Sequence, residues 1–389
     1  MAEPGNRIHL RMRSLPEIIN GYNPSAPLAQ ASTIPSAWYT DPRVFELEKQ
    51  TVFTNSWHFA ARADQLQRPG DYVTTEIAGE PIVLIVGADS VLRGFFNVCR
   101  HHAAAVMTEP AGNVAQMRCP YHGWTYSLEG ELKGTPDFSG VCNFDRNDNG
   151  LAEIATARWE GWIFIRLDSG PGPPLNESGN LENFLGDDLI DQFRKLELQN
   201  LRWFERRHYS LNCNWKVFVD NYLDGGYHVP HLHKGLDSVL DYGSYAIENG
   251  KHFCLQSSPM IAEGAETHTG AVRKGDRARY YWIYPDLMIN CYADTMDTNV
   301  VVPLAVNKTA VIFDFYFADV SPPAREHNVA SVNVGERIQQ EDLAICESVQ
   351  RGLSSRAYDT GRLSVRREAG EHLFHRLLHA DLLAGIGPQ

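Results

Sequence analysis

The chain has 389 residues, of which 43% are hydrophobic, and a formal net charge of −13. This length predicts two domains, and the acidic balance argues against nucleic acid as the main partner. The longest apolar runs, at 81–88 and 161–167, are strand-sized, so no membrane span is expected. Seven cysteines are too few for a disulfide scaffold of this size. We therefore expect a reducing, cytoplasmic compartment, with an organellar stroma or matrix left open.

The first half of the chain is expected to hold an arm, a helix and a β domain. Residues 1–56 form the arm and the helix, which Thr40 or Asp41 can cap and which we expect to pack with the C-terminal domain. Residues 57–167 contain short β-branched and aromatic runs separated by Gly and Asp, which predicts an all-β domain. Residues 168–180 are rich in Gly, Pro, Ser and Asn, as expected of a linker.

The second half, residues 181–389, mixes helical and strand patterns. This mixture predicts an α+β domain, and α+β is the fold class expected for the whole chain. The expected helices lie at 181–196, 214–229, 335–355 and 369–385, and the expected strands lie at 201–213, 280–293 and 309–320.

Four candidate metal ligands form two short chelating pairs in the β domain: Cys99 with His101, and Cys119 with His122. A tetrahedral zinc site accepts two Cys and two His. A Rieske [2Fe-2S] cluster accepts the same set, with both Cys on one iron and both His on the other. The alternation of Cys and His within each pair, and the length of the β domain, favour the cluster. His102 is expected to be a bystander.

A second group of candidate ligands lies more than a hundred residues later. Asp224 and His228 are four residues apart and are expected on one face of a helix. Pro230 is expected to end or bend that helix, so that His233 turns back toward the same point. Two imidazoles and one carboxylate form the facial triad of non-haem Fe(II) oxygenases, which leaves positions for O₂ and substrate. We expect Asp342 to supply the carboxylate.

Alternatives to this second site remain open. Glu341 is the second candidate for the carboxylate, and His231 is the alternative to His233. A Rieske electron carrier without oxygenase activity would need neither this site nor the C-terminal half of the chain. A zinc-stabilised binding protein would hold no iron.

Together the two motifs resemble the α-subunits of Rieske non-haem iron oxygenases over nearly the whole chain. The resemblance is carried by the segments TIPSAWYTDP, CPYHGW, CNWKVFVDNYLDGGYHVP, MDTNVVVPL and EDLAICESVQRGL. Within that family, these segments are similar to plant-type choline monooxygenases. The resemblance implies a Rieske domain, and a catalytic domain in which an antiparallel sheet grips a long helix. It also implies a homotrimer and a separate ferredoxin or flavin reductase as electron donor.

The resemblance also implies roles for single residues. Mononuclear Fe(II) is expected on three of them: His228, His233 and Asp342. In the family, an acidic residue ahead of the first ligand His bridges it to a Rieske His of the neighbouring subunit. Asp224 matches that residue, with Asp220 as the fallback, and Asn221 is expected to support the site.

The expected reaction is hydroxylation of a small substrate with O₂, and choline to betaine aldehyde hydrate is the best single prediction. A quaternary ammonium is held by aromatic rings, for which Tyr281, Trp282, Tyr284 and Tyr292 are candidates. Thr295 occupies the position where the plant enzymes have a Trp. An aromatic cage in this chain would therefore lack that indole ring. The alternative is N-demethylation or hydroxylation of another amine or betaine, or of an aromatic acid.

Overall fold

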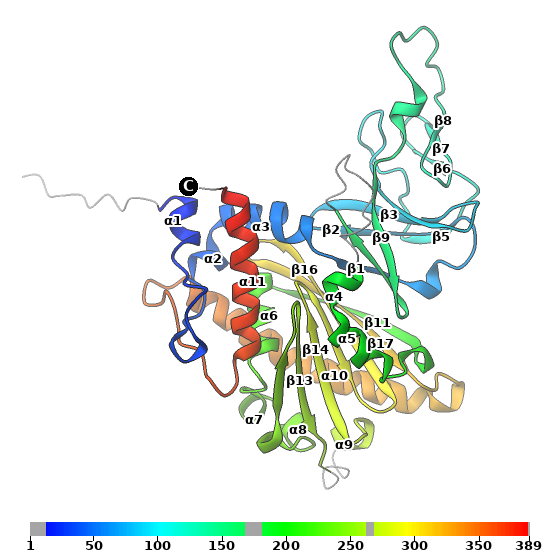
Figure 1. The fold of residues 1–389 in the computed structure, drawn as a ribbon. Helices are drawn as coiled ribbons and strands as arrows, with labels where there is room; N and C mark the ends of the chain where they lie inside the picture. Colours follow the sequence, from blue (N-terminus) through cyan, green and yellow to red (C-terminus); the bar gives the residue numbers. More distant parts are fainter. Residues whose placement is uncertain (1–12, 168–180, 262–267, 388–389) are drawn as a thin grey trace, which may run out of the picture.

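The computed structural model describes residues 13–167, 181–261 and 268–387 (Figure 1). The expected linker, 168–180, lies outside the described residues. The described chain combines helices with antiparallel sheets, which confirms the α+β class. Across these described ranges, no helix combines the length and the apolar character that crossing a bilayer requires.

The N-terminal half forms a β unit, at the upper right of Figure 1. Its larger sheet has the strand order β1-β10-β9-β4-β3-β2-β5. The strands are β1 (His58–Arg62), β2 (Asp71–Ile77), β3 (Glu80–Val86), β4 (Leu92–Phe96), β5 (Ala111–Asn113), β9 (Glu153–Trp159) and β10 (Trp162–Arg166). A smaller sheet contains β6 (Met117–Arg118), β7 (Thr125–Tyr126) and β8 (Leu132–Gly134). The turn between β7 and β8 is closed by the Gly130 N–H, which donates to the Ser127 carbonyl at 3.0 Å.

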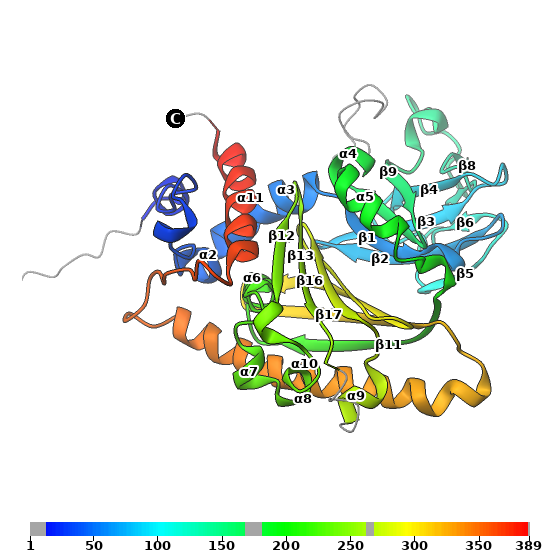
Figure 2. The same ribbon diagram turned by 60° about the horizontal axis from the view of Figure 1, so that its bottom comes forward.

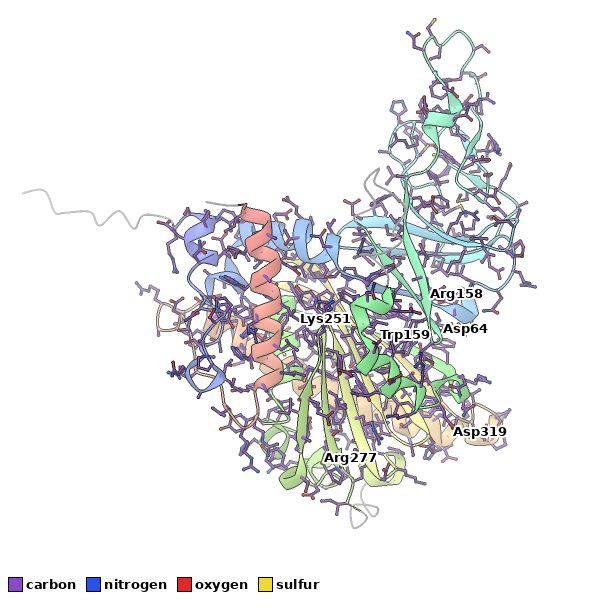
Figure 3. The ribbon with its side chains drawn as sticks, viewed as in Figure 1. Asp64, Arg158, Trp159, Lys251, Arg277 and Asp319 are labelled. Atoms are coloured by element: carbon purple, nitrogen blue, oxygen red, sulfur yellow. The ribbon has the colours of Figure 1, made fainter. Side chains whose placement is uncertain are left out.

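The C-terminal half is built on a second antiparallel sheet with the order β11-β17-β16-β15-β14-β13-β12. Its strands are β11 (Arg202–Leu211), β12 (Ala246–Asn249), β13 (Phe253–Pro259), β14 (Arg277–Ile283), β15 (Leu287–Cys291), β16 (Thr295–Ala305) and β17 (Lys308–Phe317). The sequence patterns predicted β11 and β17 but not β12, β13 or β16. The single strand predicted at 280–293 is instead two antiparallel strands, β14 and β15. In Figure 3, Lys251 and Arg277 mark opposite ends of the β13–β14 pair.

Two helices, α6 (Trp215–Leu223) and α10 (Arg325–Leu353), pack beside this sheet near the second group of candidate ligands. Helix α10 runs along the sheet (Figure 2) and begins ten residues before the predicted start at 335. It approaches closely because Gly335 has no side chain: a Cβ there would lie 3.2 Å from the Phe315 ring. Helix α6 contacts both α10 and β16.

Helix α3 (Pro42–Asn55) joins the N-terminal segment to the C-terminal half. The Asp41 side chain accepts the Arg43 N–H at the start of α3, which confirms one of the two predicted caps. Helix α3 packs on α11 (Ala369–Ile386). The buried Glu48 of α3 also pairs with Lys216 of α6 at 2.6 Å. The remaining helices are α1 (Leu15–Ile19), α2 (Ala37–Thr40), α4 (Leu181–Leu185), α5 (Asp187–Arg194), α7 (Val229–Leu232), α8 (Lys234–Asp237) and α9 (His268–Val272).

The β unit is packed against the C-terminal half at the end of β9. There the Trp159 ring lies 4.6 Å from the Phe193 ring of α5, between centroids. Next to it, Arg158 donates to the Leu66 carbonyl at 2.9 Å. Figure 3 shows Arg158, Trp159 and Asp64 together at this junction.

Candidate functional site

The first group of candidate ligands lies on two loops of the β unit. Cys99 and His101 follow β4, and Cys119 and His122 lie between β6 and β7. Each loop turns back through a residue with positive φ, Ala103 in the first and Gly123 in the second. The Ala103 and Gly123 N–H groups donate to the Cys99 and Cys119 carbonyls, at 3.0 and 3.1 Å. Both thiols are buried, and the two imidazole rings lie 4.7 Å apart.

Neighbouring aromatic residues support these loops. The Tyr126 hydroxyl lies 3.3 Å from the Cys99 sulfur and accepts the Arg100 N–H at 3.0 Å. The Trp124 ring stacks on the His101 ring, with centroids 4.6 Å apart. His102 is exposed, and its ring touches the His101 ring at 4.2 Å. Tyr126 therefore positions Cys99 and Trp124 positions His101, while His102 lies at the surface.

The donor set on these loops fits a [2Fe-2S] cluster. Burial is the first cause of a raised pKa for the Cys119 thiol, with Cys99 adding to it, so the Cys119 thiolate is disfavoured without a cation. Among the described residues, the buried Nδ1 of His101 has no hydrogen-bond partner. Two adjacent thiols and two adjacent imidazoles, one with an unused nitrogen, match Rieske ligation.

The second group of candidate ligands begins where α6 ends. The prediction that Asp224 and His228 share a helix face is wrong. Helix α6 stops at Leu223, and Gly225 and Gly226 both have a φ of +68°. A Cβ on Gly225 would lie 2.0 Å from the Arg367 carbonyl oxygen, so this turn requires glycine.

Pro230 also differs from its predicted role. It does not end the helix that contains Asp224; it lies in the first turn of the next helix, α7. Helix α7 ends at Leu232, so His228 and His233 flank it on either side. The two imidazole rings come together at 4.8 Å, nearly perpendicular. The short helix therefore brings the histidines together, as predicted, but by a different backbone path.

Asp342 of α10 completes this group. The ligand atoms of His228, His233 and Asp342 all lie within 4.8 Å of one another. The Asp342 Oδ1 atom lies 3.1 Å from His233 Nε2 and 3.9 Å from His228 Nε2. Two imidazoles and one carboxylate at these distances fit mononuclear Fe(II).

Polar neighbours orient each of the three side chains. Asp224 Oδ2 lies 2.5 Å from His228 Nδ1, and Glu341 Oε2 lies 2.6 Å from His233 Nδ1. Both histidines therefore direct Nε2 toward Asp342. The Asn221 amide donates to Asp342 Oδ1 at 2.8 Å.

Electrostatics at this group favour a bound cation. Burial lowers the pKa of His233, but the carboxylates of Asp342 and Glu341 outweigh burial and raise it. Three carboxylates, from Asp224, Glu341 and Asp342, surround two imidazoles. A divalent cation would neutralise this excess of negative charge.

The alternative ligands lie elsewhere. His231 is exposed, whereas His233 is buried. Glu341 contacts the Nδ1 side of His233, away from the Nε2 atoms. Asp220 accepts hydrogen bonds from the Tyr39 hydroxyl at 2.5 Å and from His375 Nε2 at 3.0 Å.

The iron-ligand candidates open into a cavity of about 110 Å³ between α6, α10 and the sheet. Of the four predicted cage residues, only Tyr292 lines it. Tyr281 packs on Phe193 instead, and Trp282 and Tyr284 belong to the hydrophobic core. The cavity is lined by three other tyrosines: Tyr222, Tyr245 and Tyr280.

Two charged residues of this cavity were not predicted from the sequence. Asp297 of β16 is buried and accepts the amides of Asn290 and Asn299, at 2.7 and 2.9 Å. Burial raises its pKa, against the nearby guanidinium of Arg273. Arg273 follows α9 and is also buried. Strand alternation was the available signal for Asp297, but β16 itself was not predicted.

Comparison with known proteins agrees with this geometry. Residues 56–145 match the Rieske [2Fe-2S] domain, and residues 198–383 match the catalytic domain of the ring hydroxylating alpha subunit. Chloroplastic choline monooxygenase of Arabidopsis thaliana is 37% identical over 370 residues, which cover 94% of this chain and 86% of that protein. The chain belongs to the Rieske non-haem iron oxygenases. It is therefore an oxidoreductase with a [2Fe-2S] cluster and mononuclear iron.

Other Rieske oxygenases are similar over comparable lengths. The carnitine monooxygenase oxygenase subunit of Escherichia coli K12 is 31% identical, over 93% of this chain and 97% of that protein. A solved quaternary ammonium Rieske monooxygenase has a TM-score of 0.80 at 28% identity, covering 93% of this chain and 96% of that chain. These relatives include enzymes named for two different substrates, choline and carnitine.

Proposed function

We propose that this chain is the terminal oxygenase component that hydroxylates a small quaternary ammonium compound. The [2Fe-2S] cluster is assigned to four residues: Cys99, His101, Cys119 and His122. The mononuclear Fe(II) is assigned to three: His228, His233 and Asp342. The observation that carries the proposal is the convergence of those three ligand atoms within 4.8 Å, at the wall of a cavity lined by tyrosines. The corresponding division is a cluster unit at 57–167, a linker at 168–180, and a catalytic unit at 181–389 packed with 1–56.

When bound, the mononuclear iron supplies O₂ activation. The overall reaction converts a substrate C–H bond, O₂, two electrons and two protons into a C–OH bond and water. The chain's own contribution is to hold the ligands and the substrate. Asp224 and Glu341 fix the orientation of the imidazoles, and Asn221 holds the Asp342 carboxylate through a 2.8 Å hydrogen bond.

The proposed electron path runs from a separate ferredoxin or flavin reductase to the cluster, and then to the iron. Within one chain, the sheet β6–β8 that carries the cluster loops lies at the opposite end from α7 (Figure 1). We therefore propose a head-to-tail homotrimer, in which the cluster of one subunit faces the iron of the next. Asp224 is proposed to connect them, because it already contacts His228 and remains partly exposed.

Choline is the substrate proposed from the sequence, with other quaternary amines as the alternative. Three cavity tyrosines, Tyr245, Tyr280 and Tyr292, support a cationic substrate, since aromatic faces attract quaternary ammonium groups.

The predicted intracellular compartment remains a prediction, and the plant relatives are named as chloroplastic.

The test is turnover by the purified protein with a ferredoxin-type reductase. The panel contains choline, carnitine, γ-butyrobetaine and benzoate, and product is measured beside O₂ uptake so that uncoupled turnover is recognised. Hydroxylation of at least one quaternary amine, but not of benzoate, is expected. Turnover of benzoate alone, or no product from a protein with both metal centres filled, would refute the proposal.

A further inference from the structure

We propose that Arg273 binds an anionic group of the substrate, so that the preferred substrate is a zwitterion carrying both a quaternary ammonium and a carboxylate. This inference rests on the proposed function and narrows it. Choline has no anionic group. The cavity therefore favours a betaine-type substrate over the one predicted from the sequence.

Arg273 is buried at the wall of the cavity that contains the iron-ligand candidates. Its side chain lines the same cavity as the three iron-ligand candidates, although it comes from the segment after α9. The residue is only 4% exposed. A guanidinium this deeply buried is costly unless an anion or several hydrogen bonds compensate it.

The surrounding protein compensates the charge of Arg273 only in part. Nη1 donates to the Ser331 hydroxyl at 2.5 Å, and the guanidinium lies 4.8 Å from the centre of the Tyr292 ring. Among the described residues, the Asp297 carboxylate acts on Arg273 electrostatically but forms no ion pair with it, and the buried Nε of Arg273 has no hydrogen-bond partner. Arginine presents its donors as a planar fork that fits a carboxylate. The described part of the chain therefore leaves the guanidinium of Arg273 without an ion-pair partner at the wall of the cavity.

The cavity also contains groups that attract the quaternary ammonium end of a substrate. The Asp297 carboxylate lines it, held by Asn290 and Asn299. The Tyr280 and Tyr292 hydroxyls lie 3.2 Å apart, so the two rings stand together near Arg273. A cation alone would meet attraction from Asp297 and the rings but repulsion from Arg273. A zwitterion satisfies both charges.

A glycine of α10 leaves the space that the Arg273 side chain occupies. Gly335 lines the cavity, and a Cβ there would lie 3.5 Å from Arg273 Nη2 and 3.2 Å from the Phe315 ring. Larger side chains at this position would displace either the guanidinium or Phe315. The glycine thus allows a long cationic side chain to fit between α10 and the sheet.

The experiment compares two ligands that differ in one charge, γ-butyrobetaine and its carboxamide. Binding is measured by calorimetry on the anaerobic, iron-loaded protein. For the unmodified protein we expect the acid to bind at least about tenfold more tightly than the amide. If the amide binds as tightly as the acid, the inference is wrong. If neither binds, and choline and carnitine do not bind either, the proposed function fails with it.

Variants then assign the effect to Arg273. Arg273→Gln should weaken binding of the acid by about 10- to 100-fold and change binding of the amide little. Arg273→Lys keeps the charge without the fork and should restore part of the loss. The control is Arg279→Gln, an arginine of β14 that does not line this cavity. Equal loss for acid and amide in Arg273→Gln would indicate a structural role and overturn the inference. If Arg273→Gln does not fold, the acid–amide comparison on the unmodified protein still decides.

Discussion

Asp224 holds His228 at two atoms: its Oδ2 oxygen lies 2.5 Å from the ring Nδ1 and accepts the backbone N–H at 3.0 Å. This double contact sets both the position of the backbone and the orientation of the ring. It depends on the turn through Gly225 and Gly226, which lets a residue at the end of α6 face the start of α7. The Nε2 atom of His228 is consequently directed toward Asp342.

Replacement of Asp224 tests whether this contact serves catalysis. Asp224→Asn should leave the cluster intact and reduce iron affinity or turnover by about 10- to 100-fold, because the carboxylate orients the His228 ring. Turnover, iron content and the spectrum of the reduced cluster are the measurements. Asp220→Asn is the matched variant, since Asp220 contacts Tyr39 and His375 instead. If Asp220→Asn lost turnover while Asp224→Asn retained it, Asp220 would be the connecting residue.

Removal of the Asp342 carboxylate tests the assignment of the iron ligands. Asp342→Ala should abolish mononuclear iron and turnover but keep the cluster absorption, because the cluster loops lie in the other half of the chain. Metal analysis alongside the visible spectrum separates the two centres. His231→Ala, at an exposed position, should behave like the unmodified protein. Turnover that survives in Asp342→Ala would show that the third ligand is misassigned.

Glu341 offers a graded test of the same site. Glu341→Gln keeps a hydrogen-bond acceptor 2.6 Å from His233 Nδ1 but removes the charge. We expect iron affinity to fall by about tenfold without being abolished, as observed when partners of metal-bound histidines are replaced. Competition with a chelator measures this affinity. A complete loss of iron would instead identify Glu341 as a direct ligand.

The buried pair Lys216–Glu48 is predicted to stabilise the junction of α3 with α6. The two side chains are fully buried and 2.6 Å apart, and Glu48 also accepts the Trp215 indole N–H at 2.8 Å. Lys216→Met leaves the Glu48 charge unpaired and should lower the free energy of unfolding by about 3–5 kcal/mol. The double variant with Glu48→Gln should recover part of this loss. Denaturant unfolding measures both, and equal stability of all three proteins would contradict the prediction.

Asp381 is predicted to make stability depend on pH. Burial raises the pKa of Asp381 from 3.8 to about 6, although the Tyr284 hydroxyl donates to it and opposes the shift. The folded state therefore holds this proton more tightly than the unfolded chain, so stability falls as the pH rises from about 4 to about 6. Asp381→Asn should flatten this part of the profile and stabilise the protein at pH 7 by up to roughly 3 kcal/mol. An unchanged pH profile of the melting temperature would contradict this.

The fold class could be predicted because most elements have clear patterns of their own. Helix α3 has its cap and its Pro42, and β17 has a long run of β-branched and aromatic residues. Strand β16 was not predicted, because its segment carries Asp297, Asn299 and Pro303, residues that usually interrupt strands. These polar residues are accommodated because they line or adjoin the cavity.

The site was only partly accessible from the sequence. Most of the ligand candidates are close together in the chain, so their proximity could be anticipated, whereas Asp342 is 109 residues from His233. Their role as ligands remains a prediction. The sequence could not show which residues of β14 face the cavity, because Tyr280 and Tyr281 are both aromatic and both buried. In the structure, Tyr280 lines the cavity and Tyr281 packs on Phe193 of α5. Arg273 comes from a segment without a motif, and only the three-dimensional structure brings it to the site.

A single-turnover experiment tests the central claim that one chain unites an electron-accepting cluster with an oxygenating iron site. The protein is reduced chemically, freed of reductant, and mixed with isotopically labelled O₂ and γ-butyrobetaine or choline. Mass spectrometry should find one labelled oxygen in the product, in proportion to the filled iron sites, and none in Asp342→Ala. Labelled product from Asp342→Ala, or no product from protein with both centres filled and reduced, would contradict the claim.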